Sequence, residues 1–480
     1  MKTSLLNFAT SLLAVAFIFP VSAQADDSKL LTLVNDLQKQ MMQMQMMLER
    51  QDQKIRALEK REPQIQVTPS SQSGEEISLM SEKEFDERLN KATGGAQEWL
   101  KDLSLKGDLR LRYEAFDFHS GSPSGSADRN RFRYRLRFGL EKKFSEDVKI
   151  GFGLNSAETA GTGVDSGLQV DPTSANTSFD NLFNFKDIFI EKVYAQYSPS
   201  WAKRGPIEKT TVAAGKLDNP FEKGSSDMVW DRDVKPEGIY EKFDLKFLDS
   251  GSLDLTGFAT FGQFILDEDI ATGEADAELF AQQIGLNAAV STPYFDKPAE
   301  LLSAFSFYNY SDYAINGNFL IGTTSLARGN TNVDGPATVL DSEDFEVLEY
   351  YNEIALYPRG IPIRPFFDLA HNIASQYVGD EELAWTLGAK IGGIKKRGDW
   401  ELSCAYRRIE PESLVGAFSD SDFGLGHAGK RGSILKLGYA LTDNITVNSG
   451  ASLVNNLTVD TAGVRDEEQR RFQLDMNWKF

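Results

Sequence analysis

Residues 129–140 read RNRFRYRLRFGL, and every second side chain in most of this stretch is apolar. The apolar positions are Phe132, Tyr134, Leu136, Phe138 and Leu140, and Arg131, Arg133, Arg135 and Arg137 stand between them. Successive side chains of a β-strand point to opposite faces, so a period of two indicates a strand. The stretch therefore predicts a strand with one apolar face and one cationic face.

The same period continues through most of the chain after residue 102. Residues 103–115 alternate in this way, and so does the last stretch, where Phe472, Leu474 and Met476 alternate with Arg471 and Gln473. With the stretch above, these segments predict three strands. We place the others near 148–157, 187–198, 209–217, 238–248, 252–265, 279–290, 301–310, 346–357, 363–371, 383–391, 400–408, 432–440 and 445–454.

The connections between these strands alternate in length. Short ones include EKKFSED (141–147) and DSG (249–251), and long ones include residues 218–237 and 409–431. Short turns at one end and long loops at the other are typical of membrane barrels. We therefore expect an all-β transmembrane antiparallel barrel of about 16 strands over residues 103–480. A secreted β-sandwich or adhesin is the alternative, but its apolar faces would point inward.

The residues before the barrel predict three further segments. Residues 1–25 combine Lys2, an apolar stretch and small residues, which predicts a signal peptide. Residues 26–61 carry apolar side chains at alternating steps of three and four, which predicts a short α-helical coiled coil. A lone amphipathic helix packed on the barrel is the alternative. Residues 62–102 predict a linker and a short helix.

The composition argues against several classes of function. The chain has 51 Lys and Arg against 71 Asp and Glu, a net charge of −20, so it lacks the cationic excess of a nucleic-acid-binding protein. Its one cysteine, Cys404, and its scattered histidines, His119, His371 and His427, show no metal-site spacing. No GxSxG motif occurs. We expect no enzyme activity, no metal and no cofactor.

Several stretches resemble a known family. RNRFRYRLRFGL (129–140), GKLDNPF (215–221), MVWDRDVKPEG (228–238) and RRFQLDMNWKF (470–480), together with the signal peptide and the heptad segment, are similar to the putative-porin family of Gram-negative outer membranes. This resemblance implies a water-filled outer-membrane channel. It also implies a trimer, as in porins of this size, with the N-terminal helices in the periplasm.

The polar faces of the strands give the candidate site. A sixteen-stranded barrel is wide enough to enclose an aqueous lumen, and cations on its lipid face would be costly. The predicted pore-lining residues are Lys106, Arg110, Arg112, Arg131, Arg133, Arg135, Arg137 and Arg471. Alternatively, these cations pair with acids of neighbouring strands and stiffen the wall.

The resemblance also implies that the third external loop folds inward and narrows the channel. The acidic residues of this predicted constriction loop are Asp218, Glu222, Asp227, Asp231, Asp233 and Glu237. An acidic loop opposite a basic wall would create a transverse field that sorts solutes by charge. The alternative is that the loop acids are simply solvated.

We therefore expect passive diffusion of small hydrophilic solutes or ions across the bacterial outer membrane. The expected partners are outer-membrane lipid and lipopolysaccharide, two further copies of the chain in a homotrimer, and a periplasmic or peptidoglycan contact through the coiled coil. No nucleic acid is expected. The alternative function is an outer-membrane anchor or adhesin that tethers the envelope through its coiled coil and conducts little.

Overall fold

The computed structural model describes residues 102–119, 128–158, 171–268, 276–313, 320–321, 324–325, 328–330, 345–374, 381–457 and 468–480. All of them belong to one compact unit, Phe85–Phe480. The predicted signal peptide (1–25), coiled coil (26–61) and linker (62–102) lie outside the described residues, apart from Asp102. Within the described ranges, no helix is both long enough and apolar enough to cross a membrane.

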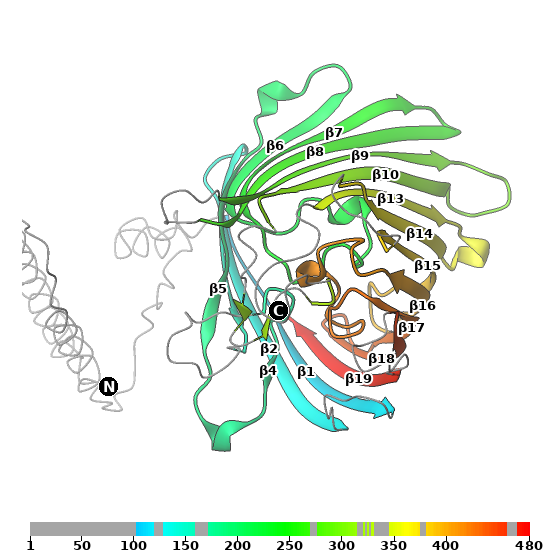
Figure 1. Cartoon of the computed structure of the whole chain (residues 1–480). Helices are drawn as coiled ribbons and strands as arrows, with labels where there is room; N and C mark the ends of the chain where they lie inside the picture. Colours follow the sequence, from blue (N-terminus) through cyan, green and yellow to red (C-terminus); the bar gives the residue numbers. More distant parts are fainter. Residues whose placement is uncertain are drawn as a thin grey trace, which may run out of the picture. The chain divides into compact units, whose positions relative to one another are not determined.

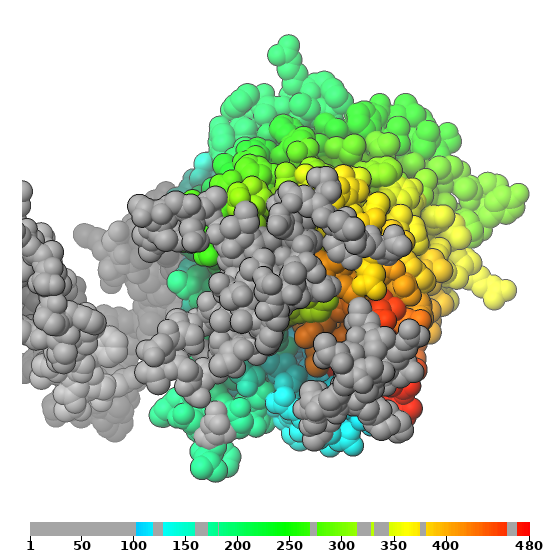
Figure 2. All heavy atoms as spheres, in the orientation of Figure 1, coloured from blue at the N-terminus to red at the C-terminus, as the bar shows by residue number. Residues whose placement is uncertain are grey.

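Sixteen strands form a closed antiparallel sheet, which confirms the expected barrel and its strand number. Each strand pairs with its neighbours in chain order, and β1 pairs with β19 to close the ring (Figure 1). In Figure 2 the red C-terminal residues and the cyan residues of the first strands lie on the same side of the barrel. The strands are β1 (Leu103–His119), β2 (Arg129–Lys143), β3 (Val148–Ser156), β5 (Ile188–Tyr197), β6 (Ile207–Lys216), β7 (Glu237–Asp249), β8 (Leu253–Asp267), β9 (Ala277–Val290), β10 (Ala299–Ser311), β13 (Phe345–Ala355), β14 (Ile363–Asn372), β15 (Leu383–Gly392), β16 (Trp400–Ile409), β17 (Lys430–Ala440), β18 (Ile445–Asn456) and β19 (Glu468–Lys479).

Shorter elements lie in the connections. The two-residue strand β4 (Thr177–Ser178) pairs with β2 at Arg133 and Tyr134, beyond the part of β2 that pairs with β3. Strands β11 (Leu320–Ile321) and β12 (Thr324–Ser325) pair with each other. The 3-10 helices are η2 (Asn181–Phe183), η3 (Ser200–Ala202), η4 (Glu222–Gly224), η5 (Pro358–Gly360) and η6 (Gly416–Phe418).

The outward face of the sheet is apolar and exposed. On β2, Phe132 and Leu136 are 59% and 38% exposed, and on β19 Phe472 and Leu474 are each 44% exposed. Cys404 of β16 is exposed as well. An apolar band on the outside of a closed sheet is typical of a barrel that crosses a bilayer, because lipid covers it. The alternating pattern thus puts apolar side chains outside, opposite to a β-sandwich.

The hydrophobic core lies inside the barrel. It combines apolar residues of the loops 217–236 and 410–429 with inward-facing residues of the wall, including Phe221, Trp230, Tyr308, Phe345 and Leu414. Figure 1 shows the green loop that follows β6 and the orange loop that follows β16 within the ring of strands. One side of the interior is thereby packed with side chains, and the opposite side carries polar residues.

Candidate functional site

The predicted cations share the inward face of β1, β2 and β19. Arg110 lies opposite Arg135 in the strand register, and Arg112 lies opposite Arg133. Like charges directly opposite each other on adjacent strands are destabilising. The wall therefore needs carboxylates to separate these guanidinium groups, and the structure places them within and around the stripe.

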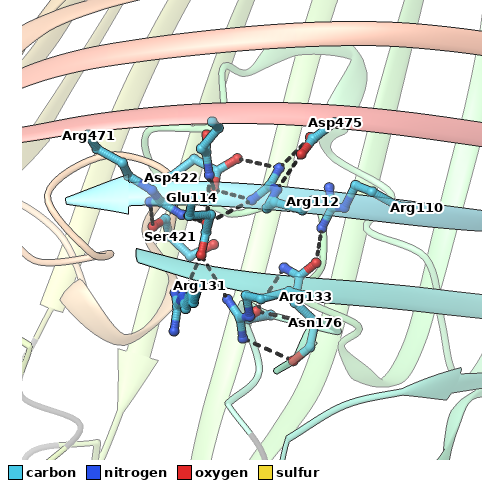
Figure 3. Close-up of polar contacts among 12 residues, drawn as sticks. Arg110, Arg112, Glu114, Arg131, Arg133, Asn176, Ser421, Asp422, Arg471 and Asp475 are labelled. Atoms are coloured by element: carbon cyan, nitrogen blue, oxygen red, sulfur yellow. Dashed lines mark hydrogen bonds and ion pairs between the residues drawn. The ribbon is translucent and has the colours of Figure 1, made fainter. Parts of the chain in front are cut away.

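Glu114 of β1 is fully buried at the centre of this stripe. Its Oε1 accepts hydrogen bonds from Arg471 at 2.5 Å and from Gln473 at 2.9 Å. Its Oε2 accepts one from Arg131 at 2.5 Å, as Figure 3 shows. Charge-assisted bonds of this kind are stronger than neutral ones, so Glu114 fixes Arg131 and Arg471 within the wall.

Arg112 contacts three carboxylates, Glu114 on its own strand and two from distant parts of the chain. It binds Asp475 of β19 in a bidentate manner, with both N···O distances at 2.7 Å. It also donates to Asp422 of the loop 410–429 at 2.9 Å, and the same carboxylate accepts a bond from Arg471 at 3.0 Å (Figure 3). The loop is thus joined directly to the cationic wall.

The other predicted cations also have polar partners. The carboxylate contacts are Lys106 to Glu141 at 3.1 Å, Arg133 to Glu158 at 3.4 Å, Arg135 to Asp108 at 2.7 Å, and Arg137 to Glu191 at 2.7 Å and to Asp233 at 2.6 Å. Arg110 differs from these, because it donates to the side-chain oxygen of Asn176 at 2.6 Å. Most of these contacts agree with the alternative prediction from the sequence, in which the cations pair with acids of neighbouring strands and stiffen the wall.

The third loop, residues 217–236, docks on the inner faces of the strands opposite the cationic wall. Ser225 donates to Glu349 of β13 at 2.6 Å, and the backbone N–H of Ser226 donates to Asp368 of β14 at 3.0 Å. The indole N–H of Trp230 donates to Tyr310 of β10 at 3.1 Å. These contacts, together with the buried Phe221, hold the loop inside the barrel.

Gly224 permits the close approach of this loop to the wall. A Cβ atom at this position would lie 2.5 Å from the Cβ of Ala304 and 3.2 Å from the amide of Gln283. That amide donates to the carbonyl oxygen of Phe221 at 2.9 Å. A larger residue would therefore push the loop away from β9 and β10.

Among the described contacts, Asp233 is the one predicted loop acid that reaches the cationic wall. Its Oδ1 lies 2.6 Å from Arg137 and 3.7 Å from Arg135. The other five have different partners: Asp218 pairs with Lys192 and Lys235, Glu222 and Asp227 with Arg232, Asp231 with the backbone N–H groups of Asp233 and Ser421, and Glu237 with Lys216. Cations outside the predicted wall thus neutralise most of the negative charge of the loop.

The two loop carboxylates that meet the wall are held in the ionised form. Burial alone would raise the pKa of Asp233, but the charges of Arg137 and Arg135 outweigh it, and the pKa lies below its usual value. Burial acts on Asp422 in the same direction, and Arg112 and Arg471 hold its pKa well below the usual range. Both carboxylates therefore bind the wall as anions at neutral pH.

Two cavities lie between the cationic wall and the inward loops. The outer chamber, of about 360 Å³, is lined by Arg129, Arg131, Arg133, Arg471 and neighbouring loop residues. The inner chamber, of about 400 Å³, is lined by Arg110, Arg112, Arg135, Arg137, Lys436 and residues of both loops. Asn176, Ser421 and Asp422 line both chambers and lie between them.

Sequence reasoning missed several residues of this arrangement. Glu114 and Asp475 could have been found, since they share the polar phase of Arg112 and Arg471 on their strands. Asp422 and Asn176 lie in connections without periodicity, so no local signal marks them. In the described ranges, no group of three or more His, Cys, Asp or Glu side chains is arranged to hold a metal ion.

The chain matches a known protein family. The family model described as “Putative porin” matches residues 121–337 and 357–480. Among solved structures, the high-pH form of Pseudomonas putida OprB is 10% identical, with a TM-score of 0.45 over 81% of this chain and 97% of that chain. Salmonella typhi OmpF in complex with daunomycin is 9% identical, with a TM-score of 0.44 over 79% and 97%. The comparison with curated proteins yields no match.

Proposed function

This chain belongs to the “Putative porin” family of outer-membrane barrels, and we propose that small hydrophilic solutes and ions diffuse passively through it. The observation that carries the proposal is a pair of polar cavities inside an externally apolar barrel. Arginines of β1, β2 and β19 line both the outer and the inner chamber. Water and solutes can hydrogen-bond to such a wall, while lipid covers the outside.

In this proposal the cationic wall is the selective surface and the third loop forms the constriction. Lys106, Arg110, Arg112, Arg131, Arg133, Arg135, Arg137 and Arg471 line the path. The contact between Asp233 and Arg137 supports the placement of the loop opposite the wall. Charges of opposite sign on the two sides orient a passing solute without any chemical step.

The seventh loop, residues 410–429, narrows the same path in this proposal. Asp422 lines both chambers and binds Arg112 and Arg471 of the wall. Two loops, rather than the third alone, thus set the width of the passage. Their carboxylates offset much of the positive charge of the wall, so we expect moderate rather than strict anion preference.

We further propose that the barrel forms a homotrimer and contacts lipid and lipopolysaccharide through its apolar band. Residues 1–25 would be the cleaved signal peptide, and residues 26–61 a coiled coil that contacts a periplasmic partner or peptidoglycan. These assignments rest on the sequence pattern. The family supports the outer membrane as the location.

The alternative is an anchor or adhesin with little conductance, and the packed loops inside the barrel favour it. A swelling assay on proteoliposomes made with the full-length protein separates the two functions. The channel predicts swelling in isotonic solutions of a small sugar, at a rate that falls with solute size. An anchor with a plugged lumen predicts the rate of protein-free liposomes.

A further inference from the structure

Two cations of the inner chamber differ from the rest of the wall. The other seven predicted pore-lining cations each have a carboxylate oxygen within 4.0 Å: Lys106, Arg112, Arg131, Arg133, Arg135, Arg137 and Arg471. Arg110 has no such partner among the described residues, and its Nε atom, like those of Arg133 and Arg471, is buried without a hydrogen-bond acceptor. Lys436 of β17 lines the same chamber, also without an ion pair in the described part of the chain.

An unsatisfied guanidinium N–H in a polar cavity is a favourable site for an anion. A buried donor without an acceptor costs free energy, and a carboxylate that accepts from it would recover that cost. Arg110 and Lys436 come from β1 and β17, two strands that border the same chamber of about 400 Å³. Pockets of this size accommodate small organic ligands.

The rest of the lining restricts the charge and the polar groups of the ligand. A second negative charge on the ligand would be repelled by the aspartates that also line the chamber, which are Asp227, Asp231, Asp233, Asp420, Asp422 and Asp475. The same carboxylates can accept hydrogen bonds from hydroxyl groups, and the amides of Asn448 and Gln473 can donate or accept them. A singly charged, hydroxylated ligand fits this lining better than a phosphate dianion.

We propose that the inner chamber binds hydroxylated organic monoanions of the sugar-acid class, with the ligand carboxylate at Arg110 and Lys436. The hydroxyl groups of the ligand then contact the surrounding carboxylates and amides. This inference rests on the proposed function, because it names the solute class for the same path. Binding in the chamber would concentrate such solutes there relative to neutral sugars.

Calorimetric titration of the full-length protein in detergent tests the site, with gluconate as the probe. Gluconate should bind more tightly than glucose or inorganic phosphate. Arg110→Gln and Lys436→Gln should each weaken gluconate binding about tenfold, as expected for the loss of one charge-assisted hydrogen bond. Arg110→Lys, which keeps the charge, should retain more of the affinity than Arg110→Gln.

Arg431→Gln is the matched control, because Arg431 is an exposed residue on the same strand as Lys436. This variant should bind gluconate as the unmodified protein does. Equal binding of gluconate by the unmodified protein and both glutamine variants would overturn the proposal, and so would tighter binding of phosphate. If Arg110→Gln fails to fold, the Lys436→Gln variant decides.

A parallel measurement of conductance in planar bilayers separates this inference from the proposed function. Gluconate binding that depends on Arg110, in a protein that does not conduct, would support the site and contradict the channel. Normal conductance without Arg110-dependent binding of gluconate would support the channel and overturn the site.

Discussion

Arg471 of β19 donates a 2.5 Å hydrogen bond to Glu114 of β1, across the seam at which the first and last strands of the barrel meet. The two residues are 357 positions apart in the chain, and both are buried. Because Glu114 also binds Arg131 of β2, one carboxylate joins three adjacent strands. Closure of the barrel and charge balance of the cationic wall therefore depend on the same residue.

Replacement of Glu114 by Gln should destabilise the barrel. The change leaves Arg131, Arg471 and Arg112 facing one another without their shared carboxylate, and loss of one partner of a buried ion pair costs ~3–5 kcal/mol. Thermal unfolding in detergent, followed by circular dichroism, should show a lower midpoint than for Glu146→Gln. Glu146 lies exposed in the turn after β2. Equal midpoints would show that the wall tolerates the uncompensated charge.

Gly224→Ala should loosen the third loop. The added Cβ would lie 2.5 Å from that of Ala304, and overpacking of this kind costs ~1–3 kcal/mol. We expect a larger single-channel conductance and faster tryptic cleavage after Arg232. Gly251→Ala, in the turn before β8 where a Cβ meets no atom within 4 Å, is the control. Identical behaviour of the two variants would remove the loop from the constriction.

Arg133→Glu combined with Arg135→Glu should reverse the ion preference. Two charge reversals beside the chambers should lower the anion-to-cation permeability ratio at least about tenfold, because each acts at short range in a medium of reduced dielectric. The reversal potential in a salt gradient measures this ratio. Lys395→Glu with Lys396→Glu, in the exposed turn after β15, provides the same change of charge away from the path. An unchanged ratio in the arginine variant would exclude these residues from the selective surface.

The contact between Asp233 of the third loop and the cationic wall should weaken only in strongly acidic solution. Burial, which alone would raise the pKa of Asp233, is outweighed by Arg137 and Arg135, so the pKa lies below the usual value of 3.8. A group with a depressed pKa contributes stability that is fully present above the unfolded-state pKa and is lost as pH falls through the folded-state pKa. Conductance should therefore show no transition from this pair between pH 8 and about pH 4.

Asp233→Asn provides the matching test at neutral pH. The variant should already differ in conductance from the unmodified protein at pH 7, because it lacks the negative charge opposite Arg137, whereas the unmodified protein keeps this charge down to about pH 4. A conductance transition between pH 5 and pH 7 that Asp233→Asn abolishes would contradict this assignment of the ionised form.

The strands could be predicted because their pattern is local. Alternation in RNRFRYRLRFGL and in the last strand reflects the two environments on either side of the barrel wall, which are lipid outside and polar groups inside along these strands. The phase of the arginines likewise predicted their shared face. No local pattern distinguishes Arg110, which lacks a carboxylate partner among the described residues, from Arg112, which has three.

The packing of the loops could not be predicted in the same way. The seventh loop binds the wall through Asp422, and its partners Arg112 and Arg471 are distant in the chain. The resemblance predicted the third loop inside the barrel with its acids facing the lumen. Two of these acids, Asp227 and Asp218, instead pair with Arg232 and Lys235 of the same loop. Contacts of this kind depend on three-dimensional register, which periodicity does not encode.

Single-channel recording of the purified full-length protein in planar bilayers tests the central claim most directly. A water-filled channel predicts discrete current steps whose size scales with salt concentration, and a trimer predicts their closure in groups of three. Folded protein that inserts into the bilayer and passes no measurable current would contradict the channel and favour an anchor.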